Sequence, residues 1–370
     1  MRKLWMAALC FFAGVSSVMA QEEDTTKHQL KIEGYTDVYF AAFSDELEPN
    51  ALQKFTTVSP RDRRFGLNAL QMQVGYESEQ VRGSFTLHYG DIAQATWSET
   101  FNMIQEANMG IELKDGLWLD AGFFSTHIGT ESYLPKNNWL SSTTVATYNE
   151  PFYQSGARLS WEGSEKFSAE LWVVSGYNFF LDANDAKSVG ALFSWNIAKG
   201  HSLTYTNLFG RESLDEAPVK QFRTYQNLYY NGQLSDRLLL TVGGDFGTQT
   251  NSVLDNPQET AIMYNALTVI RWQFDKNLSV TARGEVFNDK DGFISGLYME
   301  DTENIQGLQI YGLTLGGEYR PMPNAFVRVE TRYIQTEDEL EIFTQDGSQT
   351  NQRWEAMLTM GYTFDRLFRW

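Results

Sequence analysis

Residues 81–91 of the chain read VRGSFTLHYGD, and apolar and polar side chains alternate along this stretch. Successive side chains of a β-strand point to opposite faces, so the alternation predicts a strand with one apolar and one polar face. The apolar face would carry Val81, Gly83, Phe85, Leu87 and Tyr89, and the polar face would carry Arg82, Ser84, Thr86 and His88.

The same pattern recurs along most of the chain, and we identify sixteen runs of it. Most runs hold about 10–14 residues, which is long enough for a tilted strand to cross a bilayer. The expected strands lie near residues 29–43, 65–76, 81–90, 104–113, 117–126, 153–162, 167–178, 187–197, 201–210, 221–230, 237–247, 260–274, 277–288, 306–320, 325–335 and 351–364.

Short and long connections alternate between these runs. The short ones contain turn dipeptides such as Asn-Gly, Asp-Gly and Pro-Asn, and the longest of the others covers residues 127–152. An outer-membrane barrel has this asymmetry, whereas a soluble sandwich has no reason to gather its short turns at one end. The sequence therefore predicts an all-β fold, a transmembrane antiparallel up-and-down β-barrel of about 16 strands, with short periplasmic turns and long external loops.

The N-terminal residues have the features of an export signal. Arg2 and Lys3 precede an apolar run that ends in the small-residue cleavage pattern Val18-Met19-Ala20. We therefore expect a signal peptide over residues 1–20, a flexible leader over 21–28 and the barrel over 29–370. Export would bring the protein to the outer membrane of the cell.

The composition narrows the range of partners. The formal net charge of −18 argues against nucleic acid, which would require a basic surface. We expect contacts with outer-membrane lipid and lipopolysaccharide, and passage of small hydrophilic solutes. The histidines and the single cysteine form no zinc pattern, so we expect no metal and no cofactor.

The polar strand faces would line the interior of the barrel. A barrel of sixteen strands is wide enough to enclose an aqueous channel, in which charged side chains stay hydrated. The charged residues expected to line this lumen are Arg82, Glu106, Arg158, Glu162, Arg223, Arg283, Glu285 and Arg328. Their charges are mixed in sign, so they do not predict an ion selectivity.

Two other functions remain open from the residues alone. Ser125 and His127 have the chemistry of a nucleophile and a base, so an outer-membrane enzyme of the lipase or protease type is one alternative. The pair lacks an identifiable acid partner, and we expect no catalytic residue. A structural or adhesive barrel whose long loops bind external partners is the other alternative.

Several short motifs resemble those of the OmpL-like β-barrel porin family of gram-negative outer membranes. They are densest between Phe123 and Gly190, and a further one resembles the family's first strand. The residues concerned are Phe124, Gly129-Thr130-Glu131, Asn137-Asn138-Trp139, Glu150-Pro151-Phe152-Tyr153, Gly156-Ala157-Arg158, Val174-Ser175-Gly176, Lys187-Ser188-Val189-Gly190 and Gly34-Tyr35-Thr36-Asp37-Val38-Tyr39. The resemblance implies a porin for passive diffusion, and many porins form homotrimers.

The resemblance also assigns a role to residues 127–152, the third long connection. In porins of sixteen strands the third external loop typically folds inward and narrows the channel. By this analogy Glu131, Lys136 and Glu150 become candidates for charges at the constriction. Tyr133 and Trp139 become candidates for residues that anchor the loop to the wall.

Overall fold

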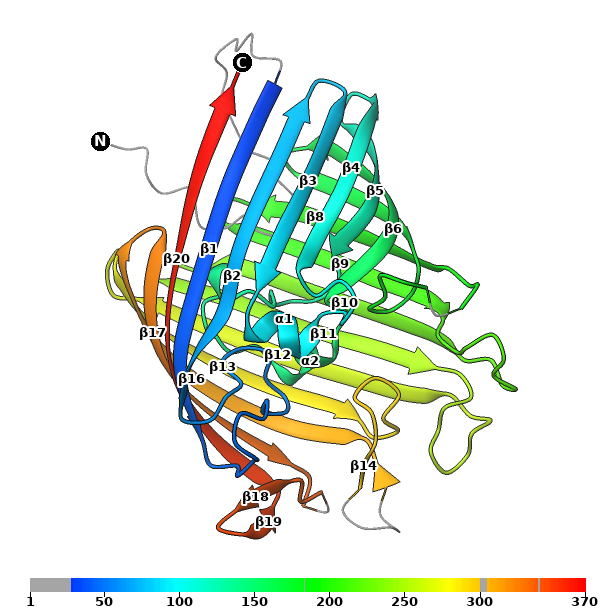
Figure 1. Ribbon diagram of the computed structural model, residues 1–370, viewed down its shortest axis with the longest axis vertical. Coiled ribbons are helices and arrows are strands. Elements are labelled where there is room, and N and C mark those ends of the chain that lie inside the picture. Colours follow the sequence, from blue (N-terminus) through cyan, green and yellow to red (C-terminus); the bar gives the residue numbers. More distant parts are fainter. Residues whose placement is uncertain (1–27, 183, 300–304, 339) are drawn as a thin grey trace.

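The computed structural model describes residues 28–182, 184–299, 305–338 and 340–370, and sixteen of its strands form a closed barrel (Figure 1). Each strand pairs antiparallel with its neighbours, and the first strand pairs with the last. The strands are β1 (His28–Phe43), β2 (Arg64–Ser78), β3 (Val81–Tyr89), β4 (Ile104–Lys114), β5 (Leu117–Ser125), β6 (Tyr153–Ser164), β7 (Phe167–Val174), β8 (Ser188–Ala198), β9 (His201–Arg211), β10 (Phe222–Gln233), β11 (Leu238–Gln249), β12 (Ala261–Gln273), β13 (Leu278–Asp289), β16 (Leu308–Met322), β17 (Ala325–Thr336) and β20 (Gln352–Arg369).

The predicted fold class is confirmed, and every expected strand has its counterpart. Two boundaries differ by more than three residues. Strand β7 ends at Val174 instead of near residue 178, because Gly176 and Asn178 adopt positive φ angles and turn the chain. Strand β20 continues to Arg369 because its last residues pair with the start of β1, for example Phe368 with Leu30.

The long connections contain elements that the alternation does not reveal. They are helix α1 (Asp91–Thr96), the 3₁₀ turn η1 (Pro135–Asn137), helix α2 (Val145–Asn149), the hairpin of β14 (Tyr298–Met299) and β15 (Ile305–Gln306), and the hairpin of β18 (Phe343–Gln345) and β19 (Ser348–Thr350). No helix in the described ranges is long and apolar enough to cross a membrane. The expected signal peptide and residues 21–27 of the expected leader lie outside the described residues, and His28 begins β1.

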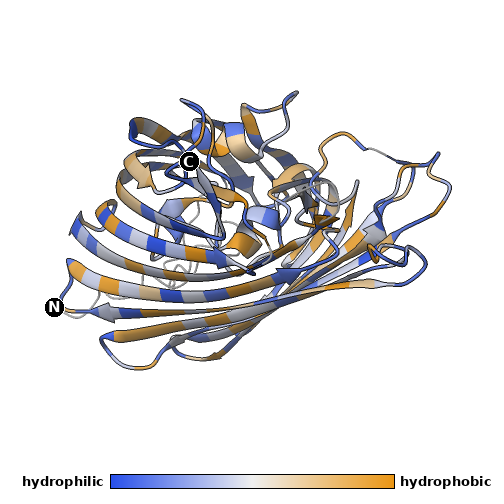
Figure 2. Ribbon diagram, turned by 90° about the horizontal axis from the view of Figure 1, so that it is seen from below, coloured by the Kyte–Doolittle hydropathy of each residue, from blue (hydrophilic) through white to orange (hydrophobic). Residues whose placement is uncertain are grey.

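The outward face of the barrel is an apolar belt with aromatic residues at both rims. Figure 2 shows apolar and polar residues alternating along the strands. Trp161, Trp195, Trp272, Tyr319 and Phe364 are exposed near the short turns, and Phe65, Tyr89, Tyr264, Tyr311 and Trp354 are exposed near the long loops. Such aromatic rings mark the two membrane interfaces of an outer-membrane barrel.

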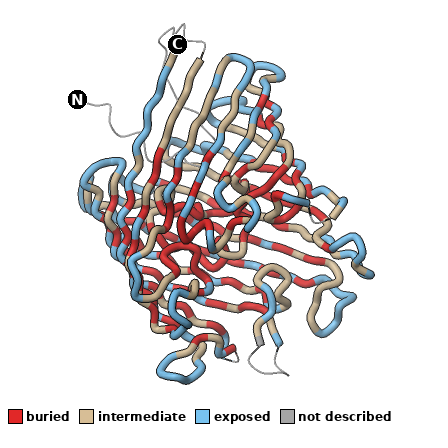
Figure 3. The backbone as a smooth tube through the Cα atoms, viewed as in Figure 1, coloured by how far each residue is buried: buried red, intermediate tan, exposed pale blue. Residues whose placement is uncertain are grey.

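The alternation predicts a polar inward face, but part of the inward face is apolar. Near the loop ends of the strands it carries buried apolar residues such as Phe287, Ile310 and Ile334. They pack in one apolar cluster with Phe55 and Val145, which come from the first and third long connections. Figure 3 shows buried residues gathered in the middle of the barrel. The loops therefore fold onto the inner wall and give the barrel an apolar core of its own.

Candidate functional site

The third loop, residues 127–152, is bound to strands on several sides of the barrel interior. His127 Nε2 donates to the carbonyl oxygen of Asn207 on β9 at 2.9 Å. Asn227 on β10 donates through Nδ2 to Thr130 Oγ1 at 2.9 Å. Lys136 Nζ donates to Gln71 Oε1 on β2 at 2.5 Å. The loop therefore reaches across the interior from the strands that carry it.

Charged side chains of one wall hold the backbone of this loop. We define the loop-bound wall as the inward face of β12, β13, β16, β17 and β20. Arg283 donates to the carbonyl oxygen of Ser142 at 2.6 Å, and Arg328 donates to those of Pro135 and Asn138 at 2.9 and 2.7 Å. Because buried carbonyl groups need a donor in place of water, these arginines stabilise the loop inside the barrel.

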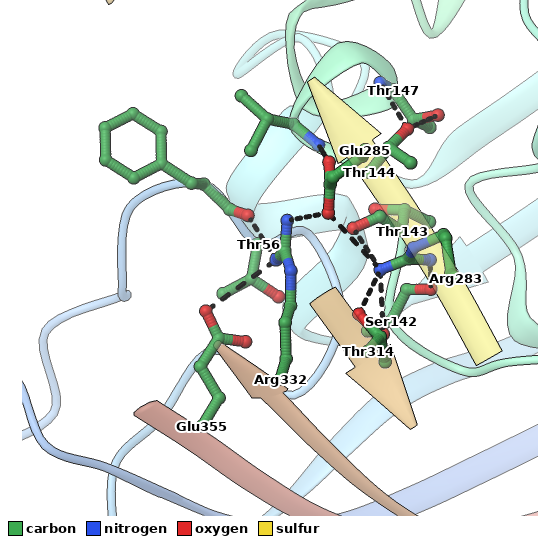
Figure 4. A network of polar contacts seen from close by, with 12 residues as sticks. Thr56, Ser142, Thr143, Thr144, Thr147, Arg283, Glu285, Thr314, Arg332 and Glu355 are labelled. Atoms are coloured by element: carbon green, nitrogen blue, oxygen red, sulfur yellow. Dashed lines mark hydrogen bonds and ion pairs between the residues drawn. The ribbon is translucent and has the colours of Figure 1, made fainter. Parts of the chain in front are cut away.

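Glutamates of the same wall bind the N–H groups of the loop. Glu330 accepts hydrogen bonds from the backbone N–H groups of Ser141 and Ser142, the second at 3.1 Å. Glu285 accepts one from the N–H of Val145 at 2.6 Å, at the start of α2. Figure 4 shows Arg283 and Glu285 side by side within this network. The wall thus supplies both donors and acceptors to a loop that has no regular strand partner.

The first long connection, residues 44–63, is held in the same way. Arg332 donates to the carbonyl oxygen of Phe55 at 3.0 Å, and Arg353 donates to that of Lys54 at 2.8 Å. Thr57 Oγ1 lies 3.4 Å from Thr143 Oγ1, which joins this connection to the third loop. Two loops therefore rest on one wall and on each other.

The arginines of the loop-bound wall are also paired with carboxylates. Their side chains and those of their partners are at most 9% exposed. The pairs are Arg271–Glu318 (2.6 Å), Arg283–Glu131 (3.0 Å), Arg328–Glu318 (2.7 Å), Arg332–Glu285 (2.9 Å) and Arg353–Glu355 (2.5 Å). A buried charge without a partner would cost several kcal/mol of desolvation, so this pairing is what allows the loop to cover the wall.

Three glycines on inward strand faces make room for the third loop. A Cβ atom at Gly190 would lie 2.7 Å from His127 Nε2, and one at Gly316 would lie 2.5 Å from Leu140 Cδ2. A Cβ atom at Gly243 would clash with the side chain of Thr130. These glycines let the loop approach strands β8, β11 and β16 closely.

A second charged cluster lies on strands from the N-terminal half of the chain, and its side chains remain partly exposed. We define the vestibule wall as the inward face of β3, β5, β6 and β7 near their short turns. Arg82 binds both carboxylate oxygens of Asp120 at 2.7 and 2.6 Å, and Arg158 binds Asp120 at 3.2 Å and Glu170 at 3.5 Å. Arg82 is 20% exposed, Arg158 18%, and Glu162, which lies 3.4 Å from Arg82, 45%. Mobile ions can therefore reach these groups.

The structure separates the expected lumen residues into groups. Arg82, Arg158 and Glu162 lie together on the vestibule wall, whereas Arg283, Glu285 and Arg328 lie on the loop-bound wall beneath the third loop. Two others stand apart. Glu106 accepts a hydrogen bond from the N–H of Ser125, and Arg223 donates to Gln249 and to the carbonyl oxygen of Phe293.

The three expected constriction charges have different surroundings. Glu131 binds Arg283 and accepts a hydrogen bond from the N–H of Thr144 at 2.7 Å. Lys136 lies 5.1 Å above the ring of Tyr35, and its partial burial lowers the pKa of its ammonium group. Glu150 is 5% exposed, and burial raises the pKa of its carboxyl group well above the ordinary value.

Of the two expected anchors, Tyr133 is buried and Trp139 is half-buried. The hydroxyl of Tyr133 lies 2.7 Å from Ser125 Oγ and accepts a hydrogen bond from Gln105 Nε2 at 2.6 Å. The ring of Tyr133 packs against Trp97, with ring centroids 5.4 Å apart. Tyr133 therefore fastens the start of the third loop to β4 and β5.

Several residues of the two walls were not among the expected ones. They are Asp120, Glu170, Arg271, Glu318, Glu330, Arg332, Arg353 and Glu355. Most could have been found from the alternation itself. Glu330 and Arg332, for example, share the inward face of β17 with Arg328, two and four residues away.

Ser125 and His127 are not arranged as a nucleophile and a base. Ser125 Oγ is within hydrogen-bond distance of the hydroxyl of Tyr133. The ring nitrogens of His127 contact Gln154 and the carbonyl oxygen of Asn207, and the ring stacks on Trp172 at 4.7 Å. Within the described ranges, no three His, Cys, Asp or Glu side chains are grouped so that they could hold a metal ion.

Solved structures of outer-membrane channels share this fold. The channel DcaP of Acinetobacter baumannii aligns with a TM-score of 0.62 and 10% identity, over 94% of this chain and 100% of that chain. An anion-selective porin from Comamonas acidovorans aligns with a TM-score of 0.59 and 8% identity, over 91% and 100%. OmpF of Salmonella typhi, in complex with daunomycin, aligns with a TM-score of 0.53 and 12% identity, over 94% and 100%. At these identities the likeness is one of fold.

Sequence comparison identifies the family. No curated protein matches the chain at a significant level. A family profile described as "Putative beta-barrel porin-2, OmpL-like" matches residues 29–364, which is most of the chain and includes all sixteen barrel strands except the ends of the first and last. The chain therefore belongs to this family of OmpL-like porins and is an outer-membrane porin channel.

Proposed function

We propose that the channel lets small hydrophilic solutes and ions diffuse passively, and that the third loop sets its width. The observation that carries this proposal is the set of hydrogen bonds from the third loop to β2, β9, β13 and β17. A loop bound to strands on several sides of a barrel reduces the cross-section left for solutes. Permeation then depends on the remaining width and on the charges beside it, with no chemical step.

The three candidate constriction charges would act differently. Glu131 contacts Arg283 on β13, and Glu150 contacts Asp245 on β11, so both carboxyl groups are engaged with strands of the barrel. Lys136 contacts the neutral side chain of Gln71 and the ring of Tyr35. We propose Lys136 as the loop charge that a passing ion meets first, and the vestibule wall as the surface that it meets next.

Deleting residues 132–147 tests the role of the third loop. We expect the single-channel conductance in planar bilayers to rise several-fold, because the deletion removes the first three residues of α2 and the segment that binds Arg283, Arg328 and Glu330. A matched control deletes residues 254–258 from the exposed connection between β11 and β12, and it should leave the conductance unchanged. Equal conductance of the two variants would place the third loop outside the conducting path.

We further propose how the protein is placed and assembled. Export through the N-terminal signal would bring it to the outer membrane, where the outward apolar belt would contact lipid and lipopolysaccharide. OmpT of Vibrio cholerae, described in a trimer form, aligns with a TM-score of 0.54 and 9% identity. This likeness supports the proposal that the barrel forms a homotrimer, which crosslinking of the solubilised protein would check.

A further inference from the structure

The end of the third loop is joined to β11 by two carboxyl groups. Glu150 follows α2, and Asp245 lies on the inward face of β11. Each is 5% exposed. Asn227 donates both to Asp245 and to Thr130, and a Cβ atom at the adjacent Gly129 would lie 2.5 Å from Glu150 Oε2, so the two carboxyl groups lie against one another. Such a contact requires a proton, because two ionised carboxylates cannot lie against each other in a buried site.

The groups around the pair do not compensate a second negative charge. Strand β10 presents Tyr225 and Tyr229, the connection after β7 presents Tyr177, and the third loop presents Glu131. Arg283 is paired with Glu131 at 3.0 Å, and Arg223 binds Gln249 and the carbonyl oxygen of Phe293, so among the described residues neither arginine forms an ion pair with Glu150 or Asp245. A shared proton therefore neutralises one of the two carboxyl groups, as an arginine does for the buried carboxylates of the loop-bound wall.

Hydrogen-bond donors around Asp245 fix which partner carries the charge. Asn227 donates to Asp245 Oδ1 at 2.5 Å, and Asn265 donates to Oδ2. Donors stabilise an ionised carboxylate, so Asp245 takes the negative charge and Glu150 donates the shared proton. Asn227 and Asn265 direct N–H donors at Asp245, whereas a metal ion would require their amide oxygens to point toward it. The arrangement therefore suits a shared proton better than a metal ion.

The pair holds the end of α2 beside the loop-bound wall, because β11 is the neighbour of β12 in the barrel. The N–H of Val145, at the start of α2, donates to Glu285 on β13, whereas Glu150, just after α2, contacts β11. The helix is therefore attached to β13 at its start and to β11 at its end, and only the second attachment depends on a proton.

We propose that Glu150 and Asp245 form a proton-dependent latch, which holds α2 and the end of the third loop against β10 and β11 and releases them when the proton is lost. The proposed release of the loop is inferred from this contact and does not depend on the function of the channel. A resulting increase in pore width rests on the function proposed above.

The direction of the pH dependence follows from the burial of Glu150. Burial raises the pKa of the docked carboxyl above its ordinary value of 4.5, so the latch is complete below pH 4.5 and weakens as pH rises through the raised pKa. Between these two values, undocking releases one proton. The undocking equilibrium therefore increases about tenfold per pH unit.

Thiol labelling of α2 tests the latch without requiring conduction. Ala146, buried in α2, is changed to Cys in a chain that carries Cys10→Ser, and the rate of maleimide labelling is measured between pH 5 and 9 in folded protein in detergent. The same measurement is made on a Glu150→Gln background. The glutamine amide donates to Asp245 at every pH and keeps the helix docked, so the pH dependence in this background reports ionisation of the thiol alone. We expect the ratio of the two rates to rise up to about tenfold per pH unit.

A control variant and a second readout separate the latch from the porin function. Glu216→Gln removes an exposed loop carboxylate and should keep the pH dependence of the parent. A flat rate ratio would overturn the latch whether or not the protein conducts. In bilayers, conductance of the parent should rise with pH and that of Glu150→Gln should not. Labelling that rises with pH while conductance stays constant would keep the latch and contradict the constriction role of the loop.

Discussion

The loop-bound wall and the vestibule wall are built from the same residue types and differ in what covers them. On the loop-bound wall, Arg283 and Arg332 are fully buried, and each donates to a loop carbonyl group as well as to a carboxylate. On the vestibule wall, Arg82 and Arg158 bind Asp120 but keep about a fifth of their side-chain surface exposed. Arginine is thus a structural residue on one wall and a residue open to solutes on the other.

The difference shows that an inward charge in a barrel does not by itself line a pore. On the loop-bound wall, removal of a charge leaves its partner buried, so the effect falls on stability. On the vestibule wall, water screens the partner, so the effect on stability is small and the effect falls on ion passage. The comparison can be tested by equivalent substitutions on the two walls.

The largest effect is expected from Arg332→Met on the loop-bound wall. The substitution removes the closest arginine of buried Glu285, which keeps only Arg283 at 3.7 Å, and it removes the donor to the buried Phe55 carbonyl group. We expect it to lower the free energy of unfolding by roughly 3–5 kcal/mol. Urea unfolding in lipid vesicles, followed by tryptophan fluorescence, measures the change.

Arg82→Met on the vestibule wall is the matched control for this prediction. Asp120 keeps Arg158 as a partner, so we expect a loss of about 1 kcal/mol or less. Equal losses for Arg332→Met and Arg82→Met would mean that the two walls do not differ in the way described.

An intermediate effect is expected from Gly243→Ala on β11. The added Cβ atom meets the side chain of Thr130, so the third loop must shift or the strand must bend. Overpacking of this kind costs about 1–3 kcal/mol in the same unfolding measurement.

Gly75→Ala on β2 provides the control for the glycine substitution. No heavy atom other than those of its chain neighbours lies within 4 Å of a Cβ atom built there, so no comparable loss is expected. If Gly243→Ala were as stable as Gly75→Ala, the third loop would not be closely packed on β11.

The smallest effect is expected from Arg158→Gln on the vestibule wall. Removal of a partly exposed positive charge should shift the permeability ratio toward cations by about twofold or less, because bulk ions screen the site. The reversal potential in a salt gradient measures the ratio. A shift toward anions would show that Arg158 does not face the conducting path.

Period-two alternation was sufficient to predict the barrel. It located all sixteen strands because each has a lipid face that must be apolar, as on β3, where Phe85 and Leu87 are exposed to the membrane side. It failed where the inner face is apolar as well. Ile310 and Ile334 point inward on β16 and β17, since loops that the alternation cannot describe cover them.

The candidate site was predicted in part, because contacts of loops depend on residues distant in the sequence. The alternation gave Arg283, Glu285 and Arg328 an inward direction, but it gave no indication that they bind loop backbone. Nor could it pair Glu150 with Asp245, which is 95 residues away. Helix α2 has only five residues and depends on the cap by Thr144 and on Glu285, so no helical periodicity marks it.

The pairing of β1 with β20 has a consequence for assembly. His28 and Trp370 exchange backbone hydrogen bonds at 3.1 and 3.2 Å, so the seam of the cylinder joins residues more than three hundred positions apart. Until that seam forms, β1 and β20 each leave a row of N–H and C=O groups without a partner, which is a state that lipid does not tolerate. Closure therefore joins the residues that are most distant in the sequence, and the barrel is stable in lipid only after this seam has formed.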